Sequence, residues 1–429
     1  MIKKIKSFFS GFQKDNIIRL SVKNLDDLKY FNTAKQIFIY FQNQNYKLKL
    51  VGGCVRKLIT EEKIDDMDIA INIEPEKIKK VLVEQKIKFV ETGITHGTIT
   101  VLINDFKFEI TSLRKDLSTD GRHAKVEFTS NWEQDAQRRD FTINAIYSDI
   151  SGEVYDPLNG IEDLRNGIIK FIGDPNQRIQ EDYLRILRYL RFYTQYNKNK
   201  FHDEIAIKAI KRNLDGLVKI SKERILDELF KMMKLNNFSK LFEDEFCRFI
   251  ILSILPQLRN YNRIKILNKI SYKTKKQIDK ILLLSILIVD ETDNCNFFLY
   301  KYQLSNEDKK RILFIKNSFK NYSEQYLYSK KNLLKLTYLS DKSSVIELLI
   351  FLIFVNPKKI SNIENLIDYI KEKTIPEFPI NAKFLKEEFN FLEGKQLGDA
   401  LKKLEKQWID DGFKIDKGNV KSLLNLKKI

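Results

Sequence analysis

Apolar and polar residues follow one pattern before about residue 150 and another after it. In the first part, short apolar runs and alternating runs predominate, and such patterns are typical of strands and short helices. Asn104-Asp105 separates two alternating runs and is typical of a tight hairpin turn. We expect an α/β or α+β head with strands at 46–51, 67–71, 98–103 and 106–112 and helices at 55–60 and 76–85.

From about Ile161 onward, apolar positions recur at helical spacing. One clear amphipathic face consists of Ile360, Ile363, Leu366, Ile367 and Ile370, which is the spacing of a helix with one buried side. Neither a repeat nor a Pro/Gly-rich linker separates the two parts. The pattern therefore predicts a helical C-terminal two thirds, with a boundary near 150–160.

The chain is predicted to be cytoplasmic, without a membrane span. Its longest apolar runs, 281–289 and 345–355, are well short of the ~18–20 residues that cross a bilayer and are expected to form buried helices. The N-terminus lacks the apolar core of a signal peptide. The cysteines have no spacing typical of zinc sites or disulfide frameworks; they are Cys54, Cys247 and Cys295.

Lysine and arginine total 76 against 58 aspartates and glutamates, so the formal charge is +18. Such an excess favours a polyanionic partner, because basic side chains neutralise phosphates and release counterions. A lysine-rich composition also results from AT-rich coding. Charge therefore indicates nucleic acid without establishing it.

Two aspartates stand one residue apart in the run DDMDIAI. On a strand, Asp66 and Asp68 point to one face and Asp65 to the other. Mg²⁺ prefers one or two carboxylates together with substrate phosphates, although a solvated strand end has the same pattern. A third acid, Glu109, lies in the strand FKFEITS and is expected to join the pair across the sheet.

Phosphate-binding features surround these acids. Gly52-Gly53 stands where a strand passes into a helix, so backbone N–H groups can approach a phosphate there. Arg56 and Lys57 follow within the first turn. The run RRDFTINA adds two arginines suited to bidentate phosphate contacts, and polar groups suited to a ribose. Plain turn chemistry and a capped basic helix are the structural alternatives.

The segments GGCVR, DDMDIAI, TGITHGT, RRDFTINAI, EDYLRILRYLRF and SKERILDEL follow one another in the order of class II tRNA nucleotidyltransferases, the CCA-adding enzymes. This chain resembles them over about residues 50–230. The family is related to bacterial poly(A) polymerases within the DNA-polymerase-β-like superfamily. The resemblance implies an α+β fold, with a nucleotidyltransferase head containing a small mixed sheet and an all-α neck, body and tail. The implied domains are an extension (1–25), the head (26–155), a neck with a nucleobase-selecting template (156–236), and a tRNA-binding body and tail (237–429).

The resemblance also implies a reaction. The 3′-hydroxyl of tRNA attacks the α-phosphate of CTP or ATP and pyrophosphate leaves, with Mg²⁺ as cofactor and no obligate protein partner. The implied catalytic acids are Asp66, Asp68 and Glu109, of which Asp66 and Asp68 hold metal. The implied nucleotide-binding residues are Gly52, Gly53, Arg56, Arg138, Arg139, Asp140, Asn144, Asp182, Arg185, Arg188 and Arg191.

Asp182 and Arg185 are three residues apart in a helical pattern, which predicts that they share a helix face. Aspartate only accepts hydrogen bonds and arginine only donates them. Cytosine and adenine offer the matching order of donor and acceptor, whereas uracil and guanine offer the reverse, so such a pair selects CTP and ATP. The family's amino-acid template matches these residues and Glu181. A surface salt bridge worth ~0.3 kcal/mol is the alternative. By the same resemblance, the buttress of the template consists of Ser221, Glu223, Arg224 and Glu228.

The chain departs from the family pattern at Lys57, where aspartate is usual, and at Ile179, where phenylalanine is usual. It keeps the segment RKDLSTDGRHAKVEF, which corresponds to a loop that CC-adding relatives lack. Completion to CCA is therefore expected. The alternatives are a poly(A) polymerase or A-adding enzyme of the same family, and a non-catalytic RNA-binding descendant. None of the histidines is expected to be catalytic.

Overall fold

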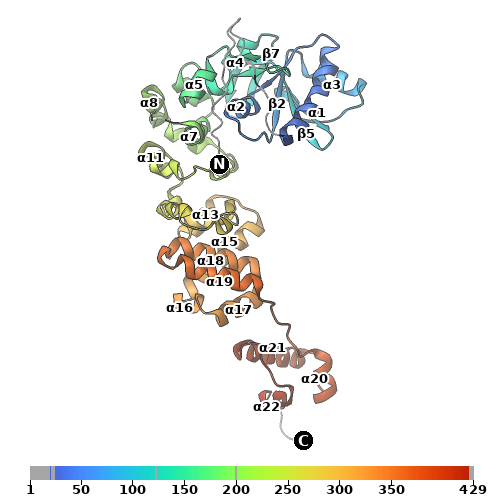
Figure 1. Cartoon of the computed structure of the whole chain (residues 1–429), viewed down its shortest axis with the longest axis vertical. Coiled ribbons are helices and arrows are strands. Elements are labelled where there is room, and N and C mark those ends of the chain that lie inside the picture. The colour runs from blue at the N-terminus through green and yellow to red at the C-terminus, as the bar shows by residue number, and fades with distance from the viewer. Residues whose placement is uncertain (1–19, 21–24, 121–122, 199–200, 425–429) are drawn as a thin grey trace, which may run out of the picture. The chain divides into compact units, whose positions relative to one another are not determined.

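The computed structural model describes residues 20, 25–120, 123–198 and 201–424. The expected N-terminal extension therefore lies almost wholly outside the described residues. The chain forms two compact units, Met1–Ile250 and Ile251–Ile429, and the division falls inside helix α11, Glu245–Ile254 (Figure 1). The predicted domain limits at 155 and 236 both lie within the first unit and remain predictions.

A mixed seven-stranded sheet forms the core of the first unit, in the order β3-β4-β5-β2-β1-β8-β9. β2 and β5 pair in parallel, and the other neighbours are antiparallel. A separate hairpin pairs β6 with β7. This mixed sheet confirms the predicted fold class. The strands are β1 Leu48–Val51, β2 Met67–Ile71, β3 Lys88–Gly93, β4 Thr98–Ile103, β5 Phe106–Ser112, β6 Arg114–Asp120, β7 His123–Phe128, β8 Tyr147–Ser148 and β9 Val154–Tyr155.

Strand prediction from alternation succeeds here because each strand buries one or both faces. β2, β4 and β5 have the predicted bounds, and β1 is two residues shorter than predicted. Asn104 and Asp105 both adopt positive φ angles, of 49° and 66°, as the tight turn between two right-twisted strands requires.

Helices cover the sheet and extend beyond it. α1 contacts β1 and β5, and α2 contacts β1 and β2. α7 packs on α9, burying Ile186, Leu187 and Leu190. The helices of this unit are α1 Leu25–Gln42, α2 Gly53–Thr60, α3 Pro75–Glu84, α4 Trp132–Gln137, α5 Gly160–Asn166, α6 Pro175–Glu181, α7 Arg185–Tyr196, α8 Glu204–Arg212, α9 Lys222–Met233 and α10 Lys240–Glu243.

The second unit is helical in its described residues, as the pattern predicts. α13 and most of α18 are buried, which confirms that the two longest apolar runs are core helices. A separate small core joins α20, α21 and α22 around Leu385, Leu404 and Val420. The helices are α12 Tyr272–Lys275, α13 Lys280–Ile288, α14 Asn294–Lys301, α15 Asn306–Asn321, α16 Glu324–Leu327, α17 Lys330–Leu339, α18 Lys342–Val355, α19 Ile360–Glu372, α20 Ala382–Phe389, α21 Lys395–Asp410 and α22 Val420–Leu423.

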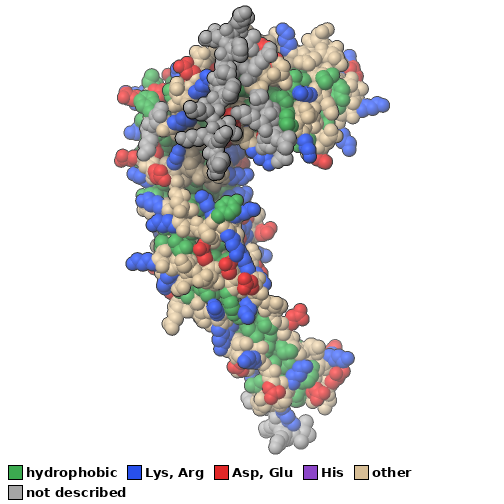
Figure 2. Space-filling view, in the orientation of Figure 1, with side chains coloured by type: hydrophobic (Ala, Val, Ile, Leu, Met, Phe, Trp, Pro, Cys, Tyr) green, Lys and Arg blue, Asp and Glu red, His purple; other side chains and the backbone are tan. Residues whose placement is uncertain are grey.

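Among the described residues, every helix is too short or too polar to cross a membrane. Lysine and arginine side chains are scattered over both units on the face shown in Figure 2 and do not gather into one patch.

Candidate active site

The three predicted acids meet where the start of β2 pairs with the middle of the parallel strand β5. Asp68 on β2 is in register with Glu109 on β5, and Asp66 immediately precedes β2. All three line a hollow of about 530 Å³. Asp66 and Asp68 also line a larger pocket of about 1290 Å³, and Glu109 is not part of its lining. The two aspartates therefore stand between the two hollows.

Asp66, Asp68 and Glu109 form an acidic edge. Nearby cations balance only part of its negative charge. Burial, together with the charges of Asp66 and Glu109, raises the pKa of Asp68 to about 6. Lys107 donates a hydrogen bond of 2.9 Å to Glu109 and offsets part of this charge. Three clustered carboxylates, among which Asp68 has a raised pKa, fit a hard divalent cation, which prefers oxygen ligands.

The glycine turn brings backbone close to these acids. Gly52 has a φ of +71°, which favours glycine, and it immediately precedes α2. A Cβ atom on Gly52 would lie 4.0 Å from an oxygen of Asp68, and one on Gly53 would lie 3.6 Å from an oxygen of Asp66. The sequence thus places a turn without side chains beside the carboxylates.

Arg56 is buried behind this turn. Its guanidinium donates to the Asn144 side chain and lies over the ring of Phe192, 4.8 Å from the ring centroid. The Nε of Arg56 is buried and has no hydrogen-bond partner among the described residues. The Arg56 residue itself lines the larger pocket. Arg56 therefore keeps a donor and its positive charge next to the space where a ligand would bind.

Asp135 organises the two arginines of the RRDF motif, and the sequence reading missed it. This fully buried carboxylate accepts 2.8–3.0 Å bonds from Arg138, Arg139 and the Tyr147 hydroxyl. Burial alone would raise the pKa of Asp135, but the two guanidinium charges outweigh it and hold that pKa well below its usual range. The signal was present, because Asp135 lies three and four residues before the two arginines.

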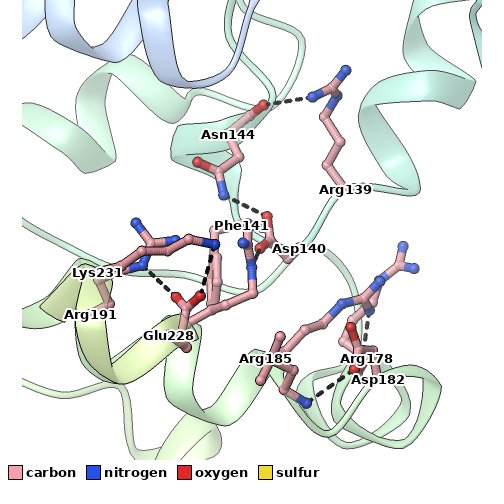
Figure 3. A network of polar contacts seen from close by, with 12 residues as sticks. Arg139, Asp140, Phe141, Asn144, Arg178, Asp182, Arg185, Arg191, Glu228 and Lys231 are labelled. Atoms are coloured by element: carbon pink, nitrogen blue, oxygen red, sulfur yellow. Dashed lines mark hydrogen bonds and ion pairs between the residues drawn. The ribbon is translucent and has the colours of Figure 1, made fainter. Parts of the chain in front are cut away.

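A second carboxylate, Asp140, organises the neighbouring residues (Figure 3). It accepts a 2.6 Å bond from the Asn144 amide and a 2.7 Å bond from Arg188. Burial opposes ionisation of Asp140, but the Arg188 charge and the Asn144 hydrogen bond keep its pKa below the usual range. Asn144 links this pair to Arg56, so the glycine turn, the RRDF motif and α7 form one network.

The expectation that Asp182 and Arg185 share a helix face is wrong. α6 ends at Glu181, Asp182 is extended with φ −154° and ψ 104°, and α7 begins at Arg185. The Asp182 side chain accepts from the backbone N–H of Leu184 at 3.1 Å, a local bond that competes with helix formation.

Each member of this pair has its own partner instead. Asp182 accepts a 2.7 Å bond from Arg224 on α9, and Arg185 donates a 2.6 Å bond to Glu181. Both nevertheless line the larger pocket. A single ligand there can therefore contact an acceptor and a donor that are already held in place.

Two residues of the predicted buttress, Arg224 and Glu228, contact residues that line the larger pocket. Arg224 holds Asp182, and the buried Glu228 accepts from Arg191, whose guanidinium lies 4.2 Å from the Phe192 ring centroid. Ser221 caps α9 through the N–H of Arg224. Glu223 is exposed and belongs to neither contact.

The larger pocket collects every predicted nucleotide-binding residue. Asp65, expected on the opposite face, lines it as well. Lys57 lines it too, and so do residues that the sequence did not assign to a site, among them Arg114, Asp116, Lys231 and Lys234.

Two of the three histidines, His96 and His202, have side chains in the described part of the chain. His96 lines the pocket, and its backbone carbonyl accepts from Arg114. His202 lies outside it, near Asp244 and Cys247, with one ring nitrogen 3.1 Å from Asp244 and the other 2.9 Å from the Tyr189 hydroxyl. These partners account for both ring nitrogens, so we interpret this group as structural. The His123 side chain lies outside the described part.

Known proteins resemble this chain over nearly its whole length. A family model described as "Poly A polymerase head domain" matches residues 48–170, and one described as "Probable RNA and SrmB- binding site of polymerase A" matches residues 203–260. The human protein named "CCA tRNA nucleotidyltransferase 1, mitochondrial" is 32% identical over 410 residues, which cover 91% of this chain and 89% of the relative.

Two solved structures share the fold. The CCA-adding enzyme of Bacillus stearothermophilus in complex with CTP has a TM-score of 0.68 at 22% identity, covering 92% of this chain and 97% of the other. The Thermotoga maritima CCA-adding enzyme complexed with tRNA has a TM-score of 0.63 at 18% identity, covering 94% and 96%.

Proposed function

Since the chain belongs to the family of CCA-adding tRNA nucleotidyltransferases, we propose that it adds or repairs the 3′ CCA end of tRNA without a nucleic-acid template. The observation that carries this proposal is the larger pocket, which combines eleven nucleotide-binding candidates with a carboxylate pair at its edge. CTP and ATP are the proposed nucleotides, and pyrophosphate is the proposed leaving group.

The acidic edge would hold the catalytic metal, which we propose to be Mg²⁺. Asp66 and Asp68 are the proposed ligands, and Glu109 is the third acid beside them in the sheet. When bound, divalent metal supplies activation of the attacking hydroxyl and charge stabilisation of the leaving oxygen. The chain's own contribution is to fix these oxygens on adjacent strands.

The basic network would bind and orient the nucleotide. Arg56, Arg138 and Arg139 surround the glycine turn and suit the triphosphate, while Asp140 and Asn144 suit the ribose. Because Asp135 already holds Arg138 and Arg139, and Asp140 already holds Asn144, little side-chain order remains to be gained on binding.

Base choice would rest on Asp182 and Arg185. Arg224 fixes the acceptor and Glu181 fixes the donor, so both are preorganised although they are not on one helix. A uracil or guanine edge would face a donor with a donor and an acceptor with an acceptor. Such mismatches in a site built for hydrogen bonding are strongly rejected.

The hairpin β6–β7 contains the segment that CC-adding relatives lack. It supports completion to CCA. We further propose that residues 237–429 bind tRNA and that the enzyme acts in the cytosol. The described chain has three free, buried cysteines, which suit a reducing compartment, whereas the human relative is named as mitochondrial.

The test uses purified chain, Mg²⁺ and tRNAs that end before CCA, after C and after CC, each with one labelled triphosphate. We expect CTP incorporation on the first two and ATP incorporation on the third. Long tails of ATP alone would identify a poly(A) polymerase, and ATP addition confined to the CC end would identify an A-adding enzyme. Retained RNA binding without any incorporation would indicate the non-catalytic alternative.

A further inference from the structure

Lys57 contacts the acidic edge from the side of α2. Its ammonium pairs with Asp65 and lies 3.7 Å from an oxygen of Asp66. The lysine side chain is only 18% exposed, whereas the two aspartates are 73% and 68% exposed. A mostly enclosed cation is thus held against two open carboxylates, one of them a proposed metal ligand.

This charge is the reverse of the one expected there, because the resembling family usually has aspartate after the motif arginine. An aspartate at position 57 would repel Asp65 and Asp66, whereas the lysine attracts them. The attraction between opposite charges at this separation is stronger near a protein surface than in bulk water. Lys57 therefore changes the electrostatics of the acidic edge in this particular chain.

The position of Lys57 relative to the two hollows indicates on which side of the reacting phosphate it lies. It lines the larger pocket together with Gly53 and Arg56, and is not among the residues that line the smaller hollow beside Glu109. In an in-line transfer, the attacking and leaving oxygens lie on opposite sides of the phosphorus. Lys57 lies on the side of the triphosphate cradle, where pyrophosphate would leave.

Lysine is suited to exchange partners there. Its ammonium is a point charge on a flexible stem and does not demand the fixed geometry of a bidentate arginine. The arginines around it are engaged with Asp135, Asp140 and Asn144. Lys57 is held only by carboxylates at the edge of the pocket.

We propose that Lys57 is a phosphate-binding residue with two alternative anionic partners, Asp65 and Asp66 in the empty enzyme and the outer phosphates of the bound triphosphate. The proposal rests on the proposed function. Without nucleotide, the ammonium competes with a divalent cation for Asp66. With nucleotide, it stabilises the triphosphate and then the leaving pyrophosphate. Removing the charge must therefore strengthen metal binding and weaken nucleotide binding.

The experiment compares the full chain with Lys57→Met, Lys57→Asp and Lys57→Arg. Calorimetry measures the Kd of Mn²⁺ alone and the Kd of CTP with Mg²⁺ in the absence of RNA, so that no transfer occurs. For Lys57→Met we expect Mn²⁺ binding about two- to fivefold tighter, as for a partly exposed ion pair. CTP should bind about tenfold more weakly, as for a lost charged hydrogen bond. For Lys57→Asp we expect larger changes in both Mn²⁺ and CTP affinity than for Lys57→Met. Lys57→Arg keeps the positive charge and should bind CTP about as tightly as wild type.

Lys79→Met is the matched control. Lys79 also contacts two acids, Glu76 at 3.1 Å and Glu91 at 3.3 Å, with a side chain 23% exposed, and it lies outside both hollows. Its removal should leave both affinities unchanged, and thermal unfolding checks that all variants fold.

Unchanged CTP affinity in Lys57→Met, or a parallel loss of Mn²⁺ and CTP affinity, would overturn the phosphate-binding role. If the wild-type chain transfers CMP and these results are nevertheless obtained, only this inference fails. If the wild-type chain binds CTP but transfers nothing, and Lys57→Met binds Mn²⁺ more tightly and CTP more weakly, the proposed function fails while Lys57 keeps its role. A wild-type chain that binds no CTP overturns both.

Discussion

Two walls of the larger pocket differ in how their charges are balanced. On the acidic wall, Asp66 and Asp68 lie together near Glu109, and the pKa of Asp68 rises to about 6. On the basic wall, Arg138, Arg139 and Arg188 already have carboxylate partners, and the pKa values of Asp135 and Asp140 fall well below their usual range.

The difference shows that folding alone orders the basic wall, whereas the acidic wall needs a bound ligand to balance its charge. Buried ion pairs with full hydrogen bonding hold their geometry without any ligand, so the basic wall is preorganised for a nucleotide. Clustered carboxylates repel one another until a cation lies between them. The acidic wall is therefore the part of the site that should respond most to divalent metal.

Removal of an acidic-wall ligand should produce the largest effect. Asp68→Ala is expected to lower kcat for CMP and AMP transfer by at least ~10³-fold, because the metal contributes several kcal/mol to stabilisation of the transition state. Binding of tRNA, measured by filter retention, should stay within about threefold of wild type. An equal loss of binding and transfer would contradict the metal role. The exposed acid Asp215 provides the control variant Asp215→Ala.

Breaking the basic wall should instead affect stability. Asp135→Asn leaves Arg138 and Arg139 without their buried counter-charge, at a cost of about 3–5 kcal/mol in urea unfolding at pH 7. The exposed pair of Lys115 and Glu127 is the control, since Glu127→Gln should cost at most ~1 kcal/mol.

The pH dependence of this loss follows from the sign of the shift. Because folding lowers the pKa of Asp135, its stabilisation is fully present above the unfolded pKa, about 3.9, and is lost as pH falls through the folded pKa. The difference between wild type and Asp135→Asn should therefore be constant from pH 7 to pH 5 and shrink below pH 4. A difference that vanishes already at pH 6 would contradict this assignment.

Base selection tests whether the basic wall also reads the nucleotide. Arg185→Ala removes one donor, so discrimination of CTP against UTP, measured as the ratio of kcat/KM values, should fall by about 10- to 100-fold, or about 1–3 kcal/mol. Arg224→Ala should have a smaller effect of the same kind through Asp182. Unchanged preference in both variants would refute the template assignment.

The sequence predicted these walls unequally well. Motif order and the predicted strands located Asp66, Asp68 and Glu109, because Asp68 and Glu109 are in register on paired strands and Asp66 immediately precedes β2. Every predicted nucleotide-binding residue lies at the larger pocket, and Glu109 lies at the smaller hollow. The partners that fix them were harder to predict, since Arg224 meets Asp182 across 42 residues of chain.

The errors have local causes. The prediction of one helical pattern through Asp182 and Arg185 ignored the ability of the Asp182 side chain to accept from a nearby backbone N–H and end α6. The strand was predicted at 67–71 and β2 has these bounds, but the alternation of faces was extended to Asp65 and Asp66, which precede the strand. Since Asp65 precedes the strand, the alternation of strand faces does not fix its side chain, which pairs with Lys57. Both errors lie at element boundaries, where side-chain bonds outweigh periodicity.

The smallest expected effect measures what burial and the charges of Asp66 and Glu109 together cost Asp68. A carboxyl whose pKa is raised by folding costs no stability below its unfolded pKa and its full cost above its folded pKa, here about 6. Asp68→Asn should therefore raise the Tm of the metal-free protein at pH 7.5 by a few degrees, since about 1 kcal/mol corresponds to roughly 2–4 °C in a unit of this size, and should change it little at pH 4. Added Mg²⁺ should raise the Tm of wild type at pH 7.5 but not that of Asp68→Asn. If Asp68→Asn instead lowers the Tm without metal, the acidic wall is balanced by its own side chains, and its contrast with the basic wall disappears.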